Sequence, residues 1–307
     1  MHDHAAKTAD PKLNERFWKE EREYLAARNR TAAARFASAA AEIARRRDKS
    51  VKILVTCMDE RNTHVEEALG LLPGEADVFA SGGGKTDFAA IERIFGSRIS
   101  SAVAAGKPVS IFLTPHECSH DANLGCAAFG NDTAAQKQFF TALKNDIVRA
   151  FPSVVTHVMA LCTTTHKLRE IDCHDAAECL IAVRGANAFF DRHAKDVGHA
   201  GYGIYVGDAY RAWVGDRNRY FRLSSLNPSL EGNIGIALTV MEHHSDVDLA
   251  ATPAVLHIDY PRHQDDDLSA AVRENIDRAT APFLNRSDLH VIKTETDVAN
   301  WQGRMLS

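Results

Sequence analysis

Short apolar runs alternate with longer amphipathic stretches along residues 51–170. These short runs predict buried strands, and they lie at 51–56, 76–80, 109–114 and 154–162. Between them, apolar residues recur at helical spacing, which predicts helices at 63–71, 86–105 and 133–150. Strands that alternate with helices in this way predict an α/β fold with a mainly parallel sheet flanked by helices.

The segments on either side of this region carry patterns of their own. Residues 10–47 read as one or two helices with few apolar positions, which predicts an N-terminal helical arm lying across a neighbouring domain or subunit. After residue 175 the pattern loosens, then restarts with a helical stretch at 267–283 among further apolar runs. Those runs lie at 202–206, 219–223, 255–259 and 289–292.

These patterns divide the chain into three regions. We expect the helical arm at 1–49, an α/β domain at 50–172 and an additional C-terminal α/β region at 173–307. The C-terminal region either extends the same sheet or forms a second, smaller lobe. No internal repeat is strong enough to indicate a duplication.

Composition narrows the class of protein. The 307 residues are 45% hydrophobic and 25% charged, with a formal net charge of -5, which is typical of a globular chain and does not favour nucleic-acid binding. No apolar stretch approaches the roughly 20 residues that cross a bilayer, and the polar N-terminus shows no secretory signal. Six cysteines in such a chain are expected as reduced thiols or metal ligands, so we predict a cytoplasmic protein without membrane or nucleic-acid partners.

Two strand ends carry the residues with the clearest chemistry. Cys57 follows the run at 51–56, while His116 follows the run at 109–114 and is separated from Cys126 by nine residues. Strands of a parallel sheet deliver their C-terminal ends to one crevice, where α/β proteins bind ligands. Two thiolates and an imidazole are ligands that zinc prefers, and three protein ligands leave a fourth position open for water. The sequence therefore predicts a zinc site with chemistry by a zinc-bound hydroxide.

Asp59 and Arg61 add a second layer to this site. The guanidinium of Arg61 is a planar, permanently charged fork that can hold the carboxylate of Asp59 in one orientation. An ionised carboxylate only accepts hydrogen bonds, so beside the metal Asp59 would accept the proton of the bound hydroxide and orient it. We therefore expect Asp59 and Arg61 to be the catalytic residues.

The spacing Cys57-x-Asp59-x-Arg61, followed by a strand-end histidine and a later cysteine, resembles the β-class carbonic anhydrases. The resemblance covers roughly residues 50–170, less than half of the chain. It implies zinc held by Cys57, His116 and Cys126, and an Asp–Arg pair that positions the hydroxide. It also implies a homo-oligomer, a dimer or higher.

The chain departs from that family's pattern in two places. The family has His-x-x-Cys, whereas nine residues between His116 and Cys126 are similar to the branch that includes the carboxysomal shell carbonic anhydrases. Ser81-Gly82-Gly83 stands where the family has an Arg-Asn turn, so hydrogen bonding on the substrate side is expected to differ. No carboxysomal targeting segment is visible, and a microcompartment association stays open.

Other residues compete for a place in the site. One residue separates Cys118 from His116, a spacing that rarely lets both bind one ion, so Cys126 is favoured as the third ligand. His120 is either a proton shuttle or, as we favour, a solvated loop residue. Cys162 ends a predicted strand and is expected as a small buried hydrophobe.

Three further motifs favour interpretations without chemistry. Residues 173–179 contain two cysteines, a histidine and an aspartate but no Cys-x-x-Cys pair, and residues 241–248 place adjacent histidines at a helix end. Neither spacing predicts a second metal site. The triglycine segment 82–86 lacks the spacing of a phosphate-binding loop and is expected to form a turn near the zinc pocket.

The activity that these residues predict is the reversible hydration of carbon dioxide to bicarbonate by a carbonic anhydrase-like zinc lyase. Two alternatives remain open: a zinc hydrolase of carbonyl sulfide or carbon disulfide, and a catalytically silent metal-binding assembly module. The sequence also leaves open whether Asp59 ligates zinc in a closed state.

Overall fold

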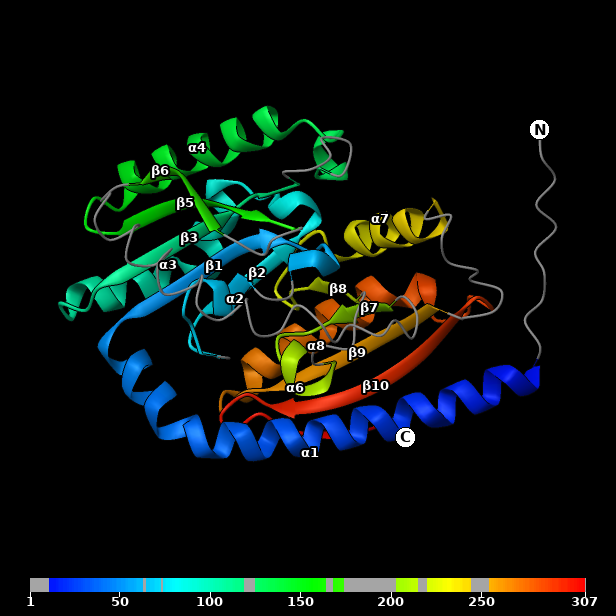
Figure 1. Ribbon diagram of the computed structural model, residues 1–307. Coiled ribbons are helices and arrows are strands. Elements are labelled where there is room, and N and C mark those ends of the chain that lie inside the picture. Colours follow the sequence, from blue (N-terminus) through cyan, green and yellow to red (C-terminus); the bar gives the residue numbers. More distant parts are fainter. Residues whose placement is uncertain are drawn as a thin grey trace. The chain divides into compact units, whose positions relative to one another are not determined.

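The computed structural model describes residues 11–62, 65–72, 74–118, 125–163, 168–173, 203–214, 220–243 and 254–306. They form two compact units, each with its own sheet (Figure 1). The first-sheet unit comprises Ser38–Asp196 with Leu226–Pro228, and the second-sheet unit comprises Met1–Ala37, Val197–Ser225 and Ser229–Ser307. Within the described part of the chain, no helix is long and apolar enough to cross a membrane.

A single long helix, α1 (Pro11–Lys49), opens the described chain. In the second-sheet unit, Asn29 of this helix donates from Nδ2 to the backbone carbonyl of Gly303 at 2.8 Å. In the first-sheet unit, Arg46 near its C-terminal end pairs with the buried carboxylate of Glu75 at 3.1 Å. The segment expected as one or two helices is therefore one helix, and polar contacts hold it at Asn29 and at Arg46.

Five strands of the first sheet run parallel, and one runs antiparallel. The strands are β1 (Val51–Cys57), β2 (Asp77–Ser81), β3 (Val109–Thr114), β4 (His116–Glu117), β5 (Val155–Cys162) and the antiparallel β6 (Leu168–Cys173). The order is β2-β1-β3-β5-β4, with β6 paired to β5. The four predicted strands are confirmed to within one residue at each end, whereas β6 was not predicted.

Helices and short turns connect these strands. They are η1 (Glu60–Asn62), α2 (Val65–Ala68), η2 (Gly82–Gly84), α3 (Phe88–Ala104), η4 (Ala127–Phe129) and α4 (Thr133–Ala150). The side chain of Asp87 accepts a hydrogen bond from the backbone of Ala90 and caps α3, and Asp132 caps α4 through Ala135. The predicted bounds of α4 are confirmed, while α2 is shorter than predicted.

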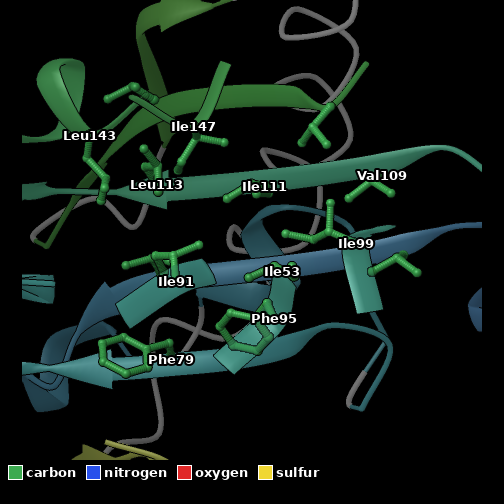
Figure 2. Packing of buried hydrophobic residues seen from close by; sticks show 14 of the residues in the cluster. Ile53, Phe79, Ile91, Phe95, Ile99, Val109, Ile111, Leu113, Leu143 and Ile147 are labelled. Atoms are coloured by element: carbon green, nitrogen blue, oxygen red, sulfur yellow. The ribbon is translucent and has the colours of Figure 1, made fainter. Parts of the chain in front are cut away.

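The main core of this unit lies between the sheet and the helices α3 and α4 (Figure 2). Figure 2 shows Leu143 at the Leu113 end of β3 and Ile147 displaced from it toward Ile111, so α4 runs antiparallel to β3. Each such fully buried aliphatic side chain stabilises the fold by about 1.5–3 kcal/mol relative to exposure. Val55 of β1 belongs to this core, so the alternation of a strand places Cys57 on the same face.

The second-sheet unit has a sheet of its own, so the C-terminal region does not extend the first sheet. Its elements are β7 (Gly203–Val206), α6 (Tyr210–Trp213), β8 (Tyr220–Leu223), α7 (Leu230–His243), β9 (Ala254–Arg262), α8 (Asp266–Thr280), η5 (Ala281–Phe283), β10 (Leu289–Asp297) and β11 (Gln302–Met305). Four strands are parallel, and β11 pairs antiparallel with β10 in the order β11-β10-β9-β7-β8.

The two sheets share one topology, although the sequence showed no repeat strong enough to indicate it. In each sheet the first strand is flanked by the second and third, the third pairs with the next long strand, and an antiparallel strand closes that side. The correspondence is therefore β1 with β7, β2 with β8, β3 with β9 and β5 with β10. It allows positions at the strand ends of the two sheets to be compared.

Candidate metal centre

Three side chains from separate elements converge at the C-terminal ends of β1 and β3. Cys57 is the last residue of β1, His116 is the first residue of β4, and Cys126 is the N-cap of η4. Their ligand atoms all lie within 4.8 Å of one another. All three side chains are buried, with at most 6% of any residue exposed. The structure thus brings together the three residues that the sequence predicted as metal ligands.

Backbone hydrogen bonds and ion pairs fix the position of His116. The amide of Leu161 donates to the carbonyl of Pro115 at 2.9 Å, and this bond sets the parallel pairing of β4 with β5 that places His116 opposite Leu161. The next residue, Glu117, pairs with Lys137 of α4 and Arg169 of β6, each at 2.8 Å. Sequence reasoning missed Glu117, because its partners are distant in the chain and one of them lies on the unpredicted strand.

The turn that carries Cys126 is compact. The amides of Phe129 and Asn131 both donate to the carbonyl of Cys126, at 2.9 and 3.0 Å. A Cβ added to Gly125 would lie 2.9 Å from the carbonyl oxygen of Asn131, so only glycine fits there. The amide of Ala128 also favours the thiolate form of Cys126. Cys126 therefore starts a short 3₁₀ turn ahead of α4, rather than α4 itself.

The triglycine turn η2 packs against the Cys126 turn. Gly83 has a φ of +68°, and a Cβ there would approach Ala128 and Phe129 to 2.8 Å. Beside it, the ammonium of Lys85 bonds to the carbonyl of Ala128 and lies 4.4 Å from the centre of the Phe129 ring. The glycines thus permit close backbone approach next to a candidate ligand, and the contacts of Lys85 were not predicted.

The spacing of the two sulfurs suits a metal ion. The Sγ atoms of Cys57 and Cys126 lie 3.9 Å apart. Two zinc–sulfur bonds of about 2.3 Å at a tetrahedral angle separate the sulfurs by about 3.8 Å. A disulfide needs about 2.05 Å, so the pair is placed for bridging by an ion and not for a direct bond.

The two thiols are coupled electrostatically. Hydrogen bonding to Cys57 lowers the pKa of Cys126 to about 5, with a further contribution from His116. Hydrogen bonding to Cys126, together with burial, raises the pKa of Cys57 well above its ordinary value. One thiolate thus forms readily and the second is opposed by the first. A divalent cation between them would remove this opposition, because it favours both thiolates.

His116 has the surroundings expected of a metal ligand. Its side chain is fully buried, yet neither ring nitrogen has a hydrogen-bond partner among the described residues. Buried polar atoms are normally paired, so these orphaned nitrogens fit a metal ligand set. Burial lowers the pKa of His116, but the adjacent Cys126 and Asp59 outweigh it and raise the pKa overall.

Asp59 and Arg61 form a bidentate ion pair beside the group of Cys57, His116 and Cys126. The Nε and Nη2 atoms of Arg61 donate to Oδ1 and Oδ2 of Asp59 at 2.8 and 2.6 Å, and the Arg61 amide adds a bond of 2.9 Å to Oδ1. Oδ2 of Asp59 also lies 3.8 Å from Nε2 of His116. Burial raises the pKa of Asp59, but Arg61 and His116 outweigh it and hold the pKa well below its usual range. The carboxylate is therefore ionised and aimed at the ligand group.

Two of the competing candidates, Cys118 and Cys162, fall outside this group. Cys118 is half-buried and Cys162 is buried at the end of β5, but neither belongs to a metal-ligating cluster among the described residues. His120 lies outside the described residues, as do the side chains of 173–179 and of 243–248. The segment 82–86 does not lead directly into a helix as a phosphate-binding loop does, since η2 ends in the extended residue Lys85.

The second sheet carries no such ligand set at its corresponding strand ends, within the part of it that the structure describes. The last residue pair between β1 and β2 is Cys57 with Ser81, and the last pair between β7 and β8 is Val206 with Leu223. Val206 therefore occupies the position of Cys57. The same registers place Asp259 at the position of His116. The shared topology therefore supplies the location of the centre, and the side chains of the first sheet supply its chemistry.

Comparisons with known proteins add a limited likeness. No family model matches the sequence, and no curated protein matches it either. Among solved structures, the chain is similar to the crystal structure of a β-carbonic anhydrase, isoform I, from the protozoan Trichomonas vaginalis. The identity is 23%, with 41% of this chain and 86% of that chain covered and a TM-score of 0.26. A likeness of this degree does not establish a family, so the assignment of a function depends on the geometry of the centre.

Proposed function

We propose that this protein binds zinc through Cys57, His116 and Cys126 and catalyses the reversible hydration of carbon dioxide to bicarbonate. The observation that carries the proposal is a buried two-cysteine, one-histidine group beside a carboxylate that an arginine holds in place. Zinc with three protein ligands lowers the pKa of a bound water to about 7 and so supplies a nucleophile at neutral pH.

The protein's own groups have separate tasks in this reaction. Asp59 is ionised, so it can only accept a hydrogen bond and fixes the orientation of whatever donates to it. Arg61 keeps Asp59 charged and immobile by two parallel hydrogen bonds. Burial of the three ligands lowers the local dielectric and strengthens each of these interactions.

A catalytically silent metal module fits the site less well. A structural zinc site is usually closed by a fourth cysteine or histidine, and no fourth such residue joins the group among the described residues. In this structure the carboxylate of Asp59 pairs with Arg61. This pairing does not favour a closed state in which Asp59 is itself a zinc ligand. The homo-oligomer that the resemblance implies stays a prediction, which the mass of the protein in solution will test.

The test combines metal analysis with substrate assays on the purified full-length chain. We expect about one zinc per chain and acceleration of carbon dioxide hydration in a stopped-flow indicator assay. Full zinc occupancy without acceleration anywhere in the neutral range would contradict the proposal. Sulfide release from carbonyl sulfide or carbon disulfide, with no hydration of carbon dioxide, would instead assign the alternative zinc hydrolase.

A further inference from the structure

One buried polar side chain of the first-sheet unit has no explanation in the fold. Gln136, in the first turn of α4, is 0% exposed, and neither Oε1 nor Nε2 has a hydrogen-bond partner among the described residues. Leaving such an amide unpaired costs about 1–3 kcal/mol, and buried side-chain amides are normally paired. A glutamine at a position that packing alone would give to an apolar residue therefore points to a ligand.

The geometry of α4 sets the level of Gln136 along the sheet. Gln136, Phe140, Leu143 and Ile147 are buried and recur at i, i+4, i+7 and i+11, so they share the face that packs on β3. Leu143 lies at the Leu113 end of β3, and α4 runs antiparallel to β3 (Figure 2). Seven helical residues rise about 10.5 Å, which equals about three strand residues at about 3.3 Å each. Gln136 therefore lies at the level of residue 116.

Contacts of Gly84 independently place Gln136 near the C-terminal ends of the strands. A Cβ built on Gly84 would lie 2.8 Å from the ring of Phe140 and 3.2 Å from the carbonyl carbon of Thr56, so both residues border Gly84. Thr56 directly precedes Cys57, and Gln136 is one helical turn beyond Phe140 toward the strand ends. Helical side chains lean toward the helix N-terminus, which carries the carboxamide further in that direction. Cys57 faces the same side of the sheet.

We infer that Gln136 binds the substrate at the metal centre, with its Nε2 donating a hydrogen bond to an oxygen of bicarbonate. The inference rests on the proposed function and names a residue that neither the sequence motif nor the resemblance supplies. A carboxamide suits this task because it offers donors without adding a charge to a buried site. It also fits the absence of the family's Arg-Asn turn, since Ser81-Gly82-Gly83 brings no long donor side chain.

The test uses cobalt(II) in place of zinc, so that bicarbonate binding is followed by the visible spectrum and not by turnover. Gln136→Met keeps the length of the side chain and removes both polar atoms, and Gln138→Met makes the same change at an exposed position of the same helix. We expect at least about ten-fold weaker bicarbonate binding in Gln136→Met. Metal content should be unchanged, and the thermal midpoint of the metal-free protein should not fall. Gln138→Met should match the wild type.

Several outcomes overturn the inference. Bicarbonate binding by Gln136→Met at the wild-type affinity shows that the amide does not touch the ligand, as does a wild-type cobalt spectrum that never responds to bicarbonate. A loss of cobalt affinity alone assigns Gln136 to the support of the metal and also overturns it. If Gln136→Met does not fold, Gln136→Leu takes its place under the same criteria. A wild type that binds cobalt and bicarbonate but hydrates no carbon dioxide overturns the proposed function, and the comparison of Gln136→Met with the wild type then still decides whether the amide holds bicarbonate.

Discussion

The sulfur atoms of Cys57 and Cys126 lie 3.9 Å apart, although 69 positions separate the two residues in the chain. This approach depends on the position of β1 between β2 and β3, and on a turn that returns the chain to the end of β1 before α4 begins. It turns two buried thiols into a pair that cannot both ionise easily without a cation. Metal binding should therefore depend on both sulfurs.

Replacing Cys57 by serine should reduce the zinc content from about one ion per chain to nearly none, since a hydroxyl is a poor ligand for zinc. Elemental analysis of the purified protein measures this directly. Cys118→Ser is the matched control, because Cys118 neighbours His116 in sequence but does not belong to the ligand group. A Cys118→Ser protein without zinc, or a fully loaded Cys57→Ser protein, would refute the ligand assignment.

Asp59→Asn should retain zinc and lose about 10²–10⁴-fold in kcat for carbon dioxide hydration, the range found when a positioned acid–base group is removed. The asparagine keeps the shape of the side chain but loses the charge that Arg61 holds in place. Stopped-flow kinetics with parallel zinc analysis separates this effect from metal loss. Unchanged kcat at full zinc occupancy would remove Asp59 from the reaction.

Gly83→Ala should destabilise the protein more than Gly106→Ala. Both glycines have a φ of +68°, so both substitutions carry a backbone penalty of about 1–2 kcal/mol. A Cβ on Gly106 meets nothing within 4 Å, whereas one on Gly83 collides with the Cys126 turn and adds about 1–3 kcal/mol. Urea unfolding gives both free energies, and zinc affinity should fall only in Gly83→Ala. Equal losses in the two variants would show that the contact between η2 and η4 is unimportant.

Asp259→Asn should change how stability depends on pH. Burial raises the pKa of Asp259 to about 7, although bonds from Thr294, Thr296 and Tyr205 oppose the shift. A raised pKa means that the folded state keeps a proton that the unfolded state releases. Wild-type stability from this group is therefore complete below about pH 4 and is lost as pH rises to about 7, by at most about 1.4 kcal/mol per pH unit.

The asparagine variant lacks this titration. Its unfolding free energy minus that of the wild type should therefore grow between about pH 4 and about pH 7 and then level off. Urea midpoints across that range provide the measurement. A difference that stays flat, or that shrinks with rising pH, would mean that Asp259 keeps an ordinary carboxylate in the folded protein.

Local sequence patterns predicted those strands and helices whose formation depends on neighbouring residues. The apolar runs predicted four of the six strands of the first sheet, and the apolar spacing predicted the bounds of α4. The sequence left open whether the C-terminal region extends the first sheet or forms a second lobe, and it did not predict strand β6, because strand pairing depends on contacts between distant segments. For the same reason the sequence did not predict that the two sheets share one topology.

The sequence by itself determined which residue types were available to hold a metal and that strand ends would present them, because alternation and strand length are written into consecutive residues. The sequence favoured Cys126 over Cys118, but tertiary structure alone decided that Glu117 pairs with distant partners beside His116 and that Gln136 is buried without a hydrogen-bond partner among the described residues. These outcomes depend on the distances in space between residues that are distant in the sequence. Packing and strand order set those distances, and no local stretch of sequence encodes them.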